Sequence, residues 1–153
     1  MKQKDYADLH ALEEEFWWFV GMRDITSALL DPICTRARDQ TILDAGCGTG
    51  GNLAWLARYA GNGKVVGIDV AAEALRFCSS DNRWRLLHGS ATHLPFADST
   101  FDLVTSFDVL VQLPGPGSDE QAIREMYRVL QPGGVAFVRV AAYEWMRSGH
   151  DEA

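Results

Sequence analysis

A glycine-rich segment, LDAGCGTGG at residues 43–51, holds the residues best placed to do chemistry. Its glycines satisfy the pattern G-x-G-x-x-G, in which the backbone can approach a ligand because no Cβ intervenes. Asp44 stands just before these glycines at the end of an apolar run, and Asp69 ends the next apolar run. A carboxylate in the position of Asp69 can accept both hydroxyls of a ribose. The segment therefore predicts a site for an adenosine-containing cofactor.

The charge of Asp44 distinguishes between two cofactors of that kind. A dinucleotide such as NAD would bring a pyrophosphate close to this carboxylate, and two like charges ~5 Å apart repel by roughly 3 kcal/mol at an effective dielectric constant near 20. S-adenosylmethionine instead carries a sulfonium and an ammonium group, which the carboxylate attracts. Asp44 therefore favours S-adenosylmethionine, unless its side chain serves only to cap the turn that follows. An NAD-dependent enzyme stays open as an alternative.

The elements that must position these residues alternate along the chain from Thr41 onward. Short, continuous apolar runs predict strands, and the stretches between them predict helices. Helical connections imply that neighbouring strands are parallel, so the sequence predicts a doubly wound α/β fold. The predicted strands are 41–45, 64–70, 84–89, 101–107 and 134–142, and the predicted helices are about 50–60, 71–79 and 119–130.

Three helices are predicted with one apolar face each. Two of them, over residues 5–20 and about 23–33, precede the first strand, and Ser118 with Gln121 predicts a capping box for the helix at 119–130. In the first helix Glu13, Glu14 and Glu15 occupy much of the opposite face. The predicted apolar stripes are Leu9, Leu12, Phe16 and Phe19 or Val20 in the first helix, Ile25, Leu29 and Ile33 in the second, and Ile123, Met126, Tyr127 and Leu130 in the last.

Length and composition limit the class of protein. The 153 residues suffice for one domain with its own core, and the net charge of -7 argues against a nucleic acid partner, whose phosphates need a basic surface. No apolar run approaches the ~20 residues of a membrane helix, and the N-terminus lacks the apolar region of a signal peptide, so we expect a cytoplasmic protein with no membrane partner. The cysteines are odd in number and widely spaced, which argues against a disulfide framework or a zinc site. We predict that Cys34 and Cys78 serve only in packing.

Together these segments resemble the motifs of class I S-adenosylmethionine-dependent methyltransferases, in the group that acts on small molecules. LDAGCGTGGN resembles the first motif, VVGIDVA the second, HGSATHLPF the third, FDLVTSFDVL the fourth, and YRVLQPGG the sequence before the fifth strand. The resemblance covers about residues 16–151. It implies a Rossmann-like, mainly parallel sheet of about five strands with helices on both faces, in a single domain with residues 1–38 as a helical lid and 39–153 as the core. It also implies methyl transfer from S-adenosylmethionine to an O, N or C atom of a small molecule.

The resemblance assigns cofactor contacts to residues near the carboxyl ends of the predicted strands. Asp44 would meet the ammonium group, directly or through water, and Asp69 would bind the ribose hydroxyls. The other assigned residues are Gly46, Cys47 and Gly48 around the methionine portion, Asn52 after the glycines, Val70 on the adenine, Ser90 and Ala91 beside the adenine ring, and Phe107, whose backbone carbonyl would lie near the cofactor amine.

The segment FWWFVGMR, at residues 16–23, resembles a subgroup of the family with a similar aromatic cluster followed by Gly and Arg. Neighbours on a helix point about 100° apart, so the two tryptophans of this segment cannot both face the core. One of them, Trp18, would cover the cofactor, and Arg23 would pair with the cofactor carboxylate unless it is a solvated surface residue. We expect Phe16 and Phe19 to pack between helix and sheet.

Two features depart from the family pattern. Relatives often have Asp-Val-Leu-Glu-His after the fourth strand, whereas residues 108–112 read DVLVQ, so the Glu-His pair is missing. The sequence after Ala141 is too short for the last two strands of the family sheet, which would leave the strand at 134–142 as an apolar edge. We expect a second copy of the chain, in a homodimer, or the chain's own tail to cover this edge.

No catalytic residue and no metal site are predicted. Methyl transfer from a sulfonium mainly requires that donor and acceptor are aligned and that water is excluded. His88, His93 and His150 are candidate bases, but we interpret each as a surface or packing residue. The missing Glu-His pair and last strands favour one alternative function, a non-catalytic S-adenosylmethionine-binding or scaffold protein.

Overall fold

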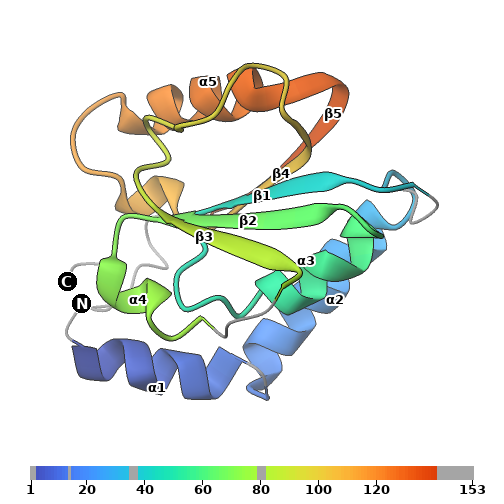
Figure 1. The fold of residues 1–153 in the computed structure, drawn as a ribbon. Coiled ribbons are helices and arrows are strands. Elements are labelled where there is room, and N and C mark those ends of the chain that lie inside the picture. The colour runs from blue at the N-terminus through green and yellow to red at the C-terminus, as the bar shows by residue number, and fades with distance from the viewer. Residues whose placement is uncertain (1–2, 14, 35–37, 79–81, 141–153) are drawn as a thin grey trace.

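The computed structural model describes residues 3–13, 15–34, 38–78 and 82–140. Five strands form one sheet in the order β3-β2-β1-β4-β5, and every pair of neighbours is parallel (Figure 1). The strands are β1 (Thr41–Ala45), β2 (Lys64–Asp69), β3 (Trp84–His88), β4 (Phe101–Phe107) and β5 (Leu130–Arg139). The helices are α1 (Gln3–Glu13), α2 (Trp17–Leu30), α3 (Leu53–Ala60), α4 (Ala72–Leu75) and α5 (Ser118–Val129), with a short 3-10 helix η1 (Leu110–Gln112). The predicted Rossmann-like α/β fold is confirmed.

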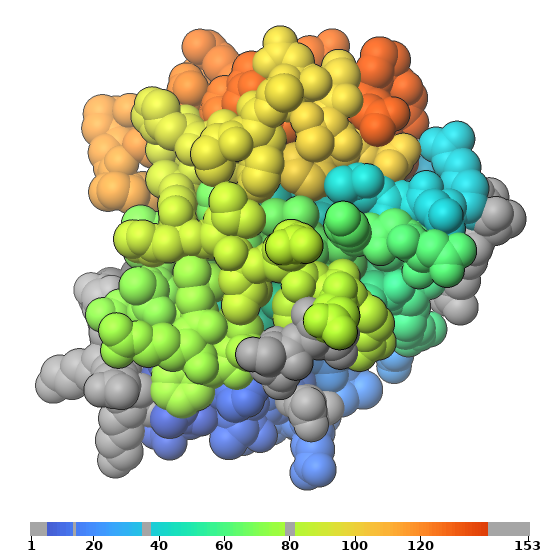
Figure 2. All heavy atoms as spheres, in the orientation of Figure 1, coloured from blue at the N-terminus to red at the C-terminus, as the bar shows by residue number. Residues whose placement is uncertain are grey.

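Helices cover both faces of the sheet because successive side chains of a strand point to opposite sides. On one face Ile42 of β1 packs with α2 and α3, and Leu56 is among the buried side chains there. On the other face Leu43 packs with α5, which contributes Met126. Burying one such side chain stabilises the fold by about 1.5–3 kcal/mol. Figure 2 shows the result from one side, with α1 at the bottom of the view and α5 at the top.

The helix expected at residues 5–20 is in fact two helices. α1 ends at Glu13 and α2 begins at Trp17, so the helix expected to start at residue 23 is the continuation of α2. The break occurs at Phe16, whose backbone is extended (φ -68, ψ 127). Because the chain turns there, the predicted apolar stripe is divided between two helices. Leu12 and Phe16 are 49% and 42% exposed, so the expectation that Phe16 packs against the sheet is wrong.

The face that α2 buries also differs from the prediction. Thr26 and Leu30 are buried, whereas the predicted stripe of Ile25, Leu29 and Ile33 is exposed. Apolar residues occur on more than one side of α2, so their spacing alone cannot select the buried face. Thr26 tolerates burial because its hydroxyl donates a hydrogen bond to the carbonyl of Met22.

The helix α5 begins where it was expected but is not capped as predicted. The Ser118 hydroxyl donates a hydrogen bond to the carbonyl of Pro114 instead of capping α5. The side-chain amide of Gln121 points to the carbonyl of Thr92, at 3.5 Å. The N-cap residue is Gly117 in the left-handed conformation (φ 77), without a side-chain cap. The predicted capping box is therefore wrong.

Three other boundaries and faces need correction. The stripe that α5 buries consists of Ala122, Met126 and Val129, whereas Ile123 and Tyr127 of the predicted stripe are 50% and 81% exposed. The prediction chose the larger apolar side chains of Ile123 and Tyr127, because the small side chain of Ala122 indicates a buried position less strongly. The helix expected at 71–79 is a single turn, and β5 begins four residues before the expected 134.

The strand order predicts a ligand site at the carboxyl ends of the strands. From β1 the chain proceeds to β2 and β3 on one side and then returns to β4 and β5 on the other. In sheets of this kind ligands bind at the carboxyl ends of the strands where the order reverses, here between β1 and β4.

Within the described residues, no helix has the length and apolar character needed to cross a membrane.

Candidate functional site

Asp44 lies in β1 beside the point where the strand order reverses, and only 1% of its surface is exposed. The register of β1 and β4 places it opposite Thr105, whose hydroxyl donates a hydrogen bond of 2.8 Å to Oδ1 of Asp44. Among the described residues none donates to Oδ2, although this atom is buried. Buried carboxylate oxygens are rarely left without a donor. Oδ2 of Asp44 is therefore the atom that a cationic ligand group would satisfy.

The environment of Asp44 is unfavourable for its own negative charge. Burial raises the pKa of this carboxyl to about 7, and the hydrogen bond from Thr105 offsets only part of that effect. The carboxylates of Asp69 and Glu13 raise the pKa further, whereas Arg139 lowers it. A bound cation would favour the ionised form for the same electrostatic reason that the neighbouring carboxylates disfavour it.

The glycine-rich loop after β1 is closed on one side and open on the other. A Cβ on Gly46 would lie 2.2 Å from Cγ2 of Val109, so this position leaves no room for a side chain, and its φ of 88 also favours glycine. A Cβ on Gly48 would meet no atom of the described residues within 4 Å. The loop therefore packs against the segment after β4 at Gly46 and faces open space at Gly48, where a ligand can approach the backbone.

Asp69 ends β2 and fixes the loop from the neighbouring strand. Its Oδ2 accepts the N–H of Gly48, and its Oδ1 accepts the N–H of Ala71, both at 2.8 Å. A carboxylate oxygen has two lone pairs, so both oxygens can still accept a hydroxyl. The next residue, Val70, is 71% exposed, and its carbonyl lies 2.9 Å from Nε2 of His88. The structure thus brings Asp69 and Val70 to the same edge as Asp44.

The remaining predicted residues of the core lie at or near this same edge. Cys47 belongs to the glycine-rich loop and its side chain is buried, and its N–H donates to the carbonyl of Ile68. Asn52 is the N-cap residue of α3 and makes no side-chain cap. Ser90 and Ala91 follow β3, with Ser90 Oγ 2.8 Å from the hydroxyl of Thr92 and Ala91 in the core beside α5. Phe107 ends β4, and its ring packs edge to face on Trp55.

The N-terminal candidates lie on α2. Trp18 is 46% exposed and packs edge to face with Trp17, which is 70% exposed. Arg23 donates a hydrogen bond of 2.8 Å to the backbone carbonyl of Glu13 and so fastens α2 to the end of α1. The structure therefore gives Arg23 a role in positioning α1, and its pairing with a cofactor carboxylate stays a prediction.

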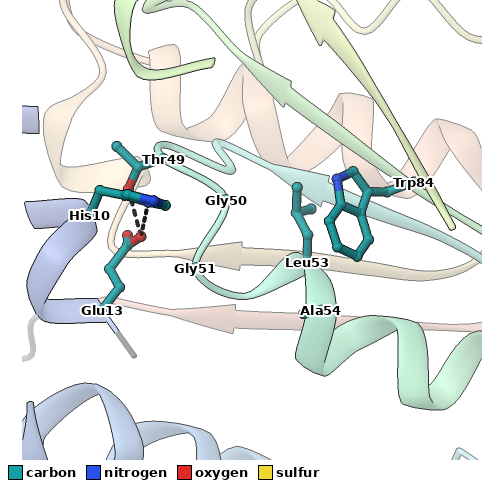
Figure 3. Close-up of a pocket in the computed structure, with 8 residues that line it drawn as sticks. All are labelled: His10, Glu13, Thr49, Gly50, Gly51, Leu53, Ala54 and Trp84. Atoms are coloured by element: carbon teal, nitrogen blue, oxygen red, sulfur yellow. Dashed lines mark hydrogen bonds and ion pairs between the residues drawn. The ribbon is translucent and has the colours of Figure 1, made fainter. Parts of the chain in front are cut away.

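Glu13 is a member of the site that the sequence did not indicate. Its Oε2 accepts the hydroxyl of Thr49 at 2.6 Å, and Nδ1 of His10 lies 3.9 Å away (Figure 3). These groups line a cavity of about 60 Å³ between α1 and the glycine-rich loop. A Cβ on Gly51 would lie 2.6 Å from the carboxyl group of Glu13, so this glycine makes room for it. Burial raises the pKa of Glu13, against the hydrogen bond from Thr49.

A cation at the end of β5 was also missed. Nη2 of Arg139 lies 2.6 Å from Oδ2 of Asp108, and the guanidinium lies 5.0 Å from the ring centre of Phe107. The backbone of Asp108 has a φ of 59, and its N–H donates to the carbonyl of Arg139. Only the pairing of β4 with β5 brings these residues together, so their spacing in the sequence carries no signal.

The comparison with protein families agrees with this geometry. The family described as "Methyltransferase domain" matches residues 43–138, which is more than half of the chain. The chain belongs to the class I S-adenosylmethionine-dependent methyltransferases. S-adenosylmethionine is therefore the cofactor, and the NAD-dependent alternative is wrong.

Individual relatives share part of their length with the chain. The methyltransferase GfsG of Streptomyces halstedii is 37% identical over 99 residues, which cover 61% of this chain and 34% of that protein. The demethylmenaquinone methyltransferase of Lactiplantibacillus plantarum is 40% identical over 106 residues, covering 63% of this chain and 43% of that protein. The chain thus spans less than half the length of these two relatives.

A solved structure extends the comparison to the fold. A putative S-adenosyl-L-methionine-dependent methyltransferase from Methanococcus maripaludis superposes with a TM-score of 0.73 at 18% identity, covering 90% of this chain and 63% of that one. At this identity the likeness establishes a common fold.

The described residues fit the cofactor. Oδ2 of Asp44 is a buried carboxylate oxygen without a hydrogen-bond partner among the described residues, which suits the ammonium group of S-adenosylmethionine, and the backbone at Gly48 is open to a ligand. The two hydroxyls of its ribose need acceptors, and the carboxylate of Asp69 at the adjacent strand end could accept them beside the N–H groups that it already holds.

Proposed function

We propose that this chain transfers a methyl group from S-adenosylmethionine to an O, N or C atom of a small-molecule acceptor in the cytoplasm. One observation carries the proposal: Oδ2 of Asp44 is buried at the switch point of the sheet without a hydrogen-bond donor among the described residues. A positively charged cofactor satisfies this oxygen, whereas a pyrophosphate would add a like charge.

The residues of the chain act mainly by binding and orienting. S-adenosylmethionine, when bound, supplies a methyl group already activated by the positive sulfur. Asp44 would hold the ammonium group, the backbone at Gly46 and Gly48 would border the methionine portion, and Asp69 would hold the ribose. Holding the donor in one orientation, away from water, is the larger part of what this reaction requires.

The proposal assigns no general base. His88 and His93 are exposed, and both already have hydrogen-bond partners: Nε2 of His88 lies 2.9 Å from the carbonyl of Val70, and Nδ1 of His93 lies 3.0 Å from the hydroxyl of Thr92. His150 lies outside the described residues. A transfer to an acceptor that is already nucleophilic needs no base, so the proposed reaction does not depend on one.

The segment after β4 supports a small organic acceptor. Where relatives have Glu and His, this chain has Val111, which is 48% exposed, and Gln112, whose amide donates to the backbone of Asp108. An apolar and a neutral side chain at this place favour an acceptor that is held by contact area rather than by charge. The names of the relatives support catalysis rather than binding alone, although those relatives differ in their acceptors.

Calorimetric titration with S-adenosylhomocysteine and S-adenosylmethionine, followed by transfer of a labelled methyl group to a panel of small acceptors, tests the proposal. Asp44→Asn should weaken cofactor binding. Asp102→Asn is the matched control. Asp102 accepts the N–H of Thr41 at 2.9 Å, at the amino ends of the same strands and so away from the proposed site. Cofactor binding without transfer to any acceptor would instead support the non-catalytic alternative.

We also propose a homodimer that covers the outer edge of β5. The strand is the last of the sheet among the described residues, and Val138 in the strand and Val140 just after it are 39% and 43% exposed. Exposed apolar strand edges favour pairing with another chain. Residues 141–153, the other candidate cover, lie outside the described residues. A monomer in light scattering, with fast amide exchange along residues 135–140, would refute both forms of cover.

A further inference from the structure

Two cysteines that are far apart in the sequence meet beneath the glycine-rich loop. Cys47 belongs to the loop, and Cys78 follows α4. Both side chains pack in one cluster with Leu53 of α3, and each shifts the pKa of the other through a side-chain hydrogen bond. Sγ of Cys78 also lies 3.6 Å from the backbone carbonyl of Gly48, to which it donates. The fold has thus paired two thiols at the backbone that faces the cofactor.

The surroundings of both sulfur atoms are shaped by glycines. A Cβ on Gly67 of β2 would lie 2.8 Å from Sγ of Cys47, and a Cβ on Gly50 would lie 2.8 Å from Sγ of Cys78. Any side chain at either position would press on a thiol. The two glycines therefore keep the space that the two sulfur atoms occupy on either side of Leu53.

The two thiols differ in access and in acidity. Cys47 is 6% exposed, whereas Cys78 is only partly buried and so is the one that a reagent in solution can reach first. The hydrogen bond from Cys47 lowers the pKa of Cys78, while the same contact and burial raise the pKa of Cys47. The thiolate is the nucleophile in disulfide exchange, so Cys78 is suited to attack and Cys47 to follow.

We propose that Cys47 and Cys78 are a reversible disulfide pair that closes the cofactor site when oxidised. The oxidant is a small-molecule disulfide such as oxidised glutathione. The Cys78 thiolate attacks one glutathione sulfur, the S–S bond breaks, and one glutathione leaves and takes up the proton. Cys47, whose pKa is no longer raised by a hydrogen bond to the Cys78 thiolate, then loses its proton and attacks Cys78 in the mixed disulfide, and the second glutathione leaves and takes up that proton. Two protein thiols are oxidised, and one glutathione disulfide is reduced to two thiols.

Forming this bond must move the loop. A disulfide is about 2.05 Å long, which is shorter than any contact between two thiols. The two sulfur atoms must approach one another, and we expect the movement of Cys47 to displace the backbone of its neighbours Gly46 and Gly48. Because the proposed function places the methionine portion against those two glycines, we expect cofactor affinity to fall on the order of tenfold or more.

Thermodynamic linkage supplies a second expectation. If the disulfide weakens cofactor binding by some factor, a bound cofactor must shift the dithiol–disulfide equilibrium toward the dithiol by the same factor. For a two-electron couple, a tenfold factor corresponds to about 30 mV. S-adenosylhomocysteine should therefore protect the pair against oxidation.

The experiment equilibrates the full chain in glutathione buffers of increasing oxidised fraction and traps free thiols with N-ethylmaleimide. Mass spectrometry should find two peptides joined by a disulfide between Cys47 and Cys78. Cys34, which is 4% exposed, should react with N-ethylmaleimide only after the chain is denatured. Calorimetry with S-adenosylhomocysteine on the reduced and oxidised chains then gives the affinity ratio. Cys78→Ser is the control, because its hydroxyl can still donate to Gly48 but cannot form the bond.

The outcomes separate this inference from the proposed function. Full alkylation of both thiols in excess oxidised glutathione would overturn the pairing, and equal affinity of the two forms would overturn the closure of the site. Both readouts use the unmodified sequence, so neither depends on the folding of a variant. A reduced chain that forms the link but never binds S-adenosylhomocysteine would refute the proposed function and leave the thiol pair supported.

Discussion

Replacing Asp44 by asparagine should separate what this carboxyl group contributes to folding from what it contributes to binding. Burial raises its pKa from 3.8 to about 7, so between these values the folded chain binds more protons than the unfolded chain. Stability must therefore fall as the pH rises through this window. Each unit by which the pKa is raised corresponds to about 1.4 kcal/mol. The free energy of unfolding should therefore be about 4 kcal/mol lower at pH 8, where the carboxyl group is ionised, than at pH 3.

The asparagine variant lacks this dependence. Its side-chain oxygen can still accept the hydroxyl of Thr105, but its amide nitrogen takes the place of Oδ2, which has no hydrogen-bond partner among the described residues, at a cost of about 1–3 kcal/mol. Asp44→Asn should therefore be less stable than the original chain near pH 4 and more stable near pH 8. Cofactor binding should weaken on the order of 100-fold at pH 8, because the variant has no charge to attract the ammonium group.

Urea unfolding, followed by tryptophan fluorescence, to which the buried Trp55 contributes, measures the stability of both chains between pH 4 and pH 8. Calorimetry with S-adenosylhomocysteine gives the affinities. The two unfolding free energies should cross within this range, and the affinity of the original chain should fall as the pH drops below 7. Parallel stability curves would show that Asp44 titrates normally, and unchanged affinity in the variant would show that the carboxylate does not contact the cofactor.

Four other substitutions test the site and its support. Asp69→Asn should weaken S-adenosylhomocysteine binding on the order of tenfold, since it loses a charged acceptor; equal binding in calorimetry would remove Asp69 from the site. Gly46→Ala should lower the free energy of unfolding by about 1–3 kcal/mol because of its φ and the contact with Val109, and Val109→Ala should restore part of this loss in urea titrations. Glu125→Gln should destabilise the chain at pH 7, and the difference should shrink as the pH falls toward 2, because the hydrogen bond from Arg128 lowers the pKa of Glu125 to about 2. A difference that is constant with pH would contradict that account.

The strands and the cofactor loop were predictable because their signals are local. The runs at 41–45 and 101–107 are continuous and apolar, as buried parallel strands require, and both strands have the expected bounds. Asp44 and Asp69 end such runs, so their place at the carboxyl edge follows from the fold. Their positions relative to the glycines needed no information from distant parts of the chain.

The helices were less predictable because apolar residues occur on more than one of their sides. In α2, Ile25 and Leu29 form a stripe as regular as the one that is buried, and the choice between them is made by docking on the sheet. The burial of Thr26 in their place depends on a hydrogen bond within the helix, which the apolar pattern does not show. Spacing thus predicts that a helix is present more reliably than it predicts which face packs.

The parts of the site that escaped prediction are all contacts between distant segments. Cys78 reaches Cys47 and the carbonyl of Gly48 only because α4 packs beside β2 and β3. Glu13 stands in a run of three glutamates that indicates a solvated face, yet it bonds to Thr49 in the loop, 36 positions away. In each case the residue type is unremarkable, and the tertiary fold supplies the partner.

The charges that these contacts assemble explain the choice of cofactor better than the glycines do. Asp44, Asp69 and Glu13 converge on the loop, and within the part of the chain described here Arg139 is the cation that offsets them at Asp44. A diphosphate placed among three carboxylates would meet repulsion from each, whereas a sulfonium and an ammonium group relieve it. Burial, together with the carboxylates of Asp69 and Glu13, raises the pKa of Asp44 to about 7, and a bound cation would favour its ionised form. We therefore expect the ionised carboxylate to cost stability in the free chain and to contribute affinity in the bound one, which is why its substitution should move the two quantities in opposite directions at pH 8.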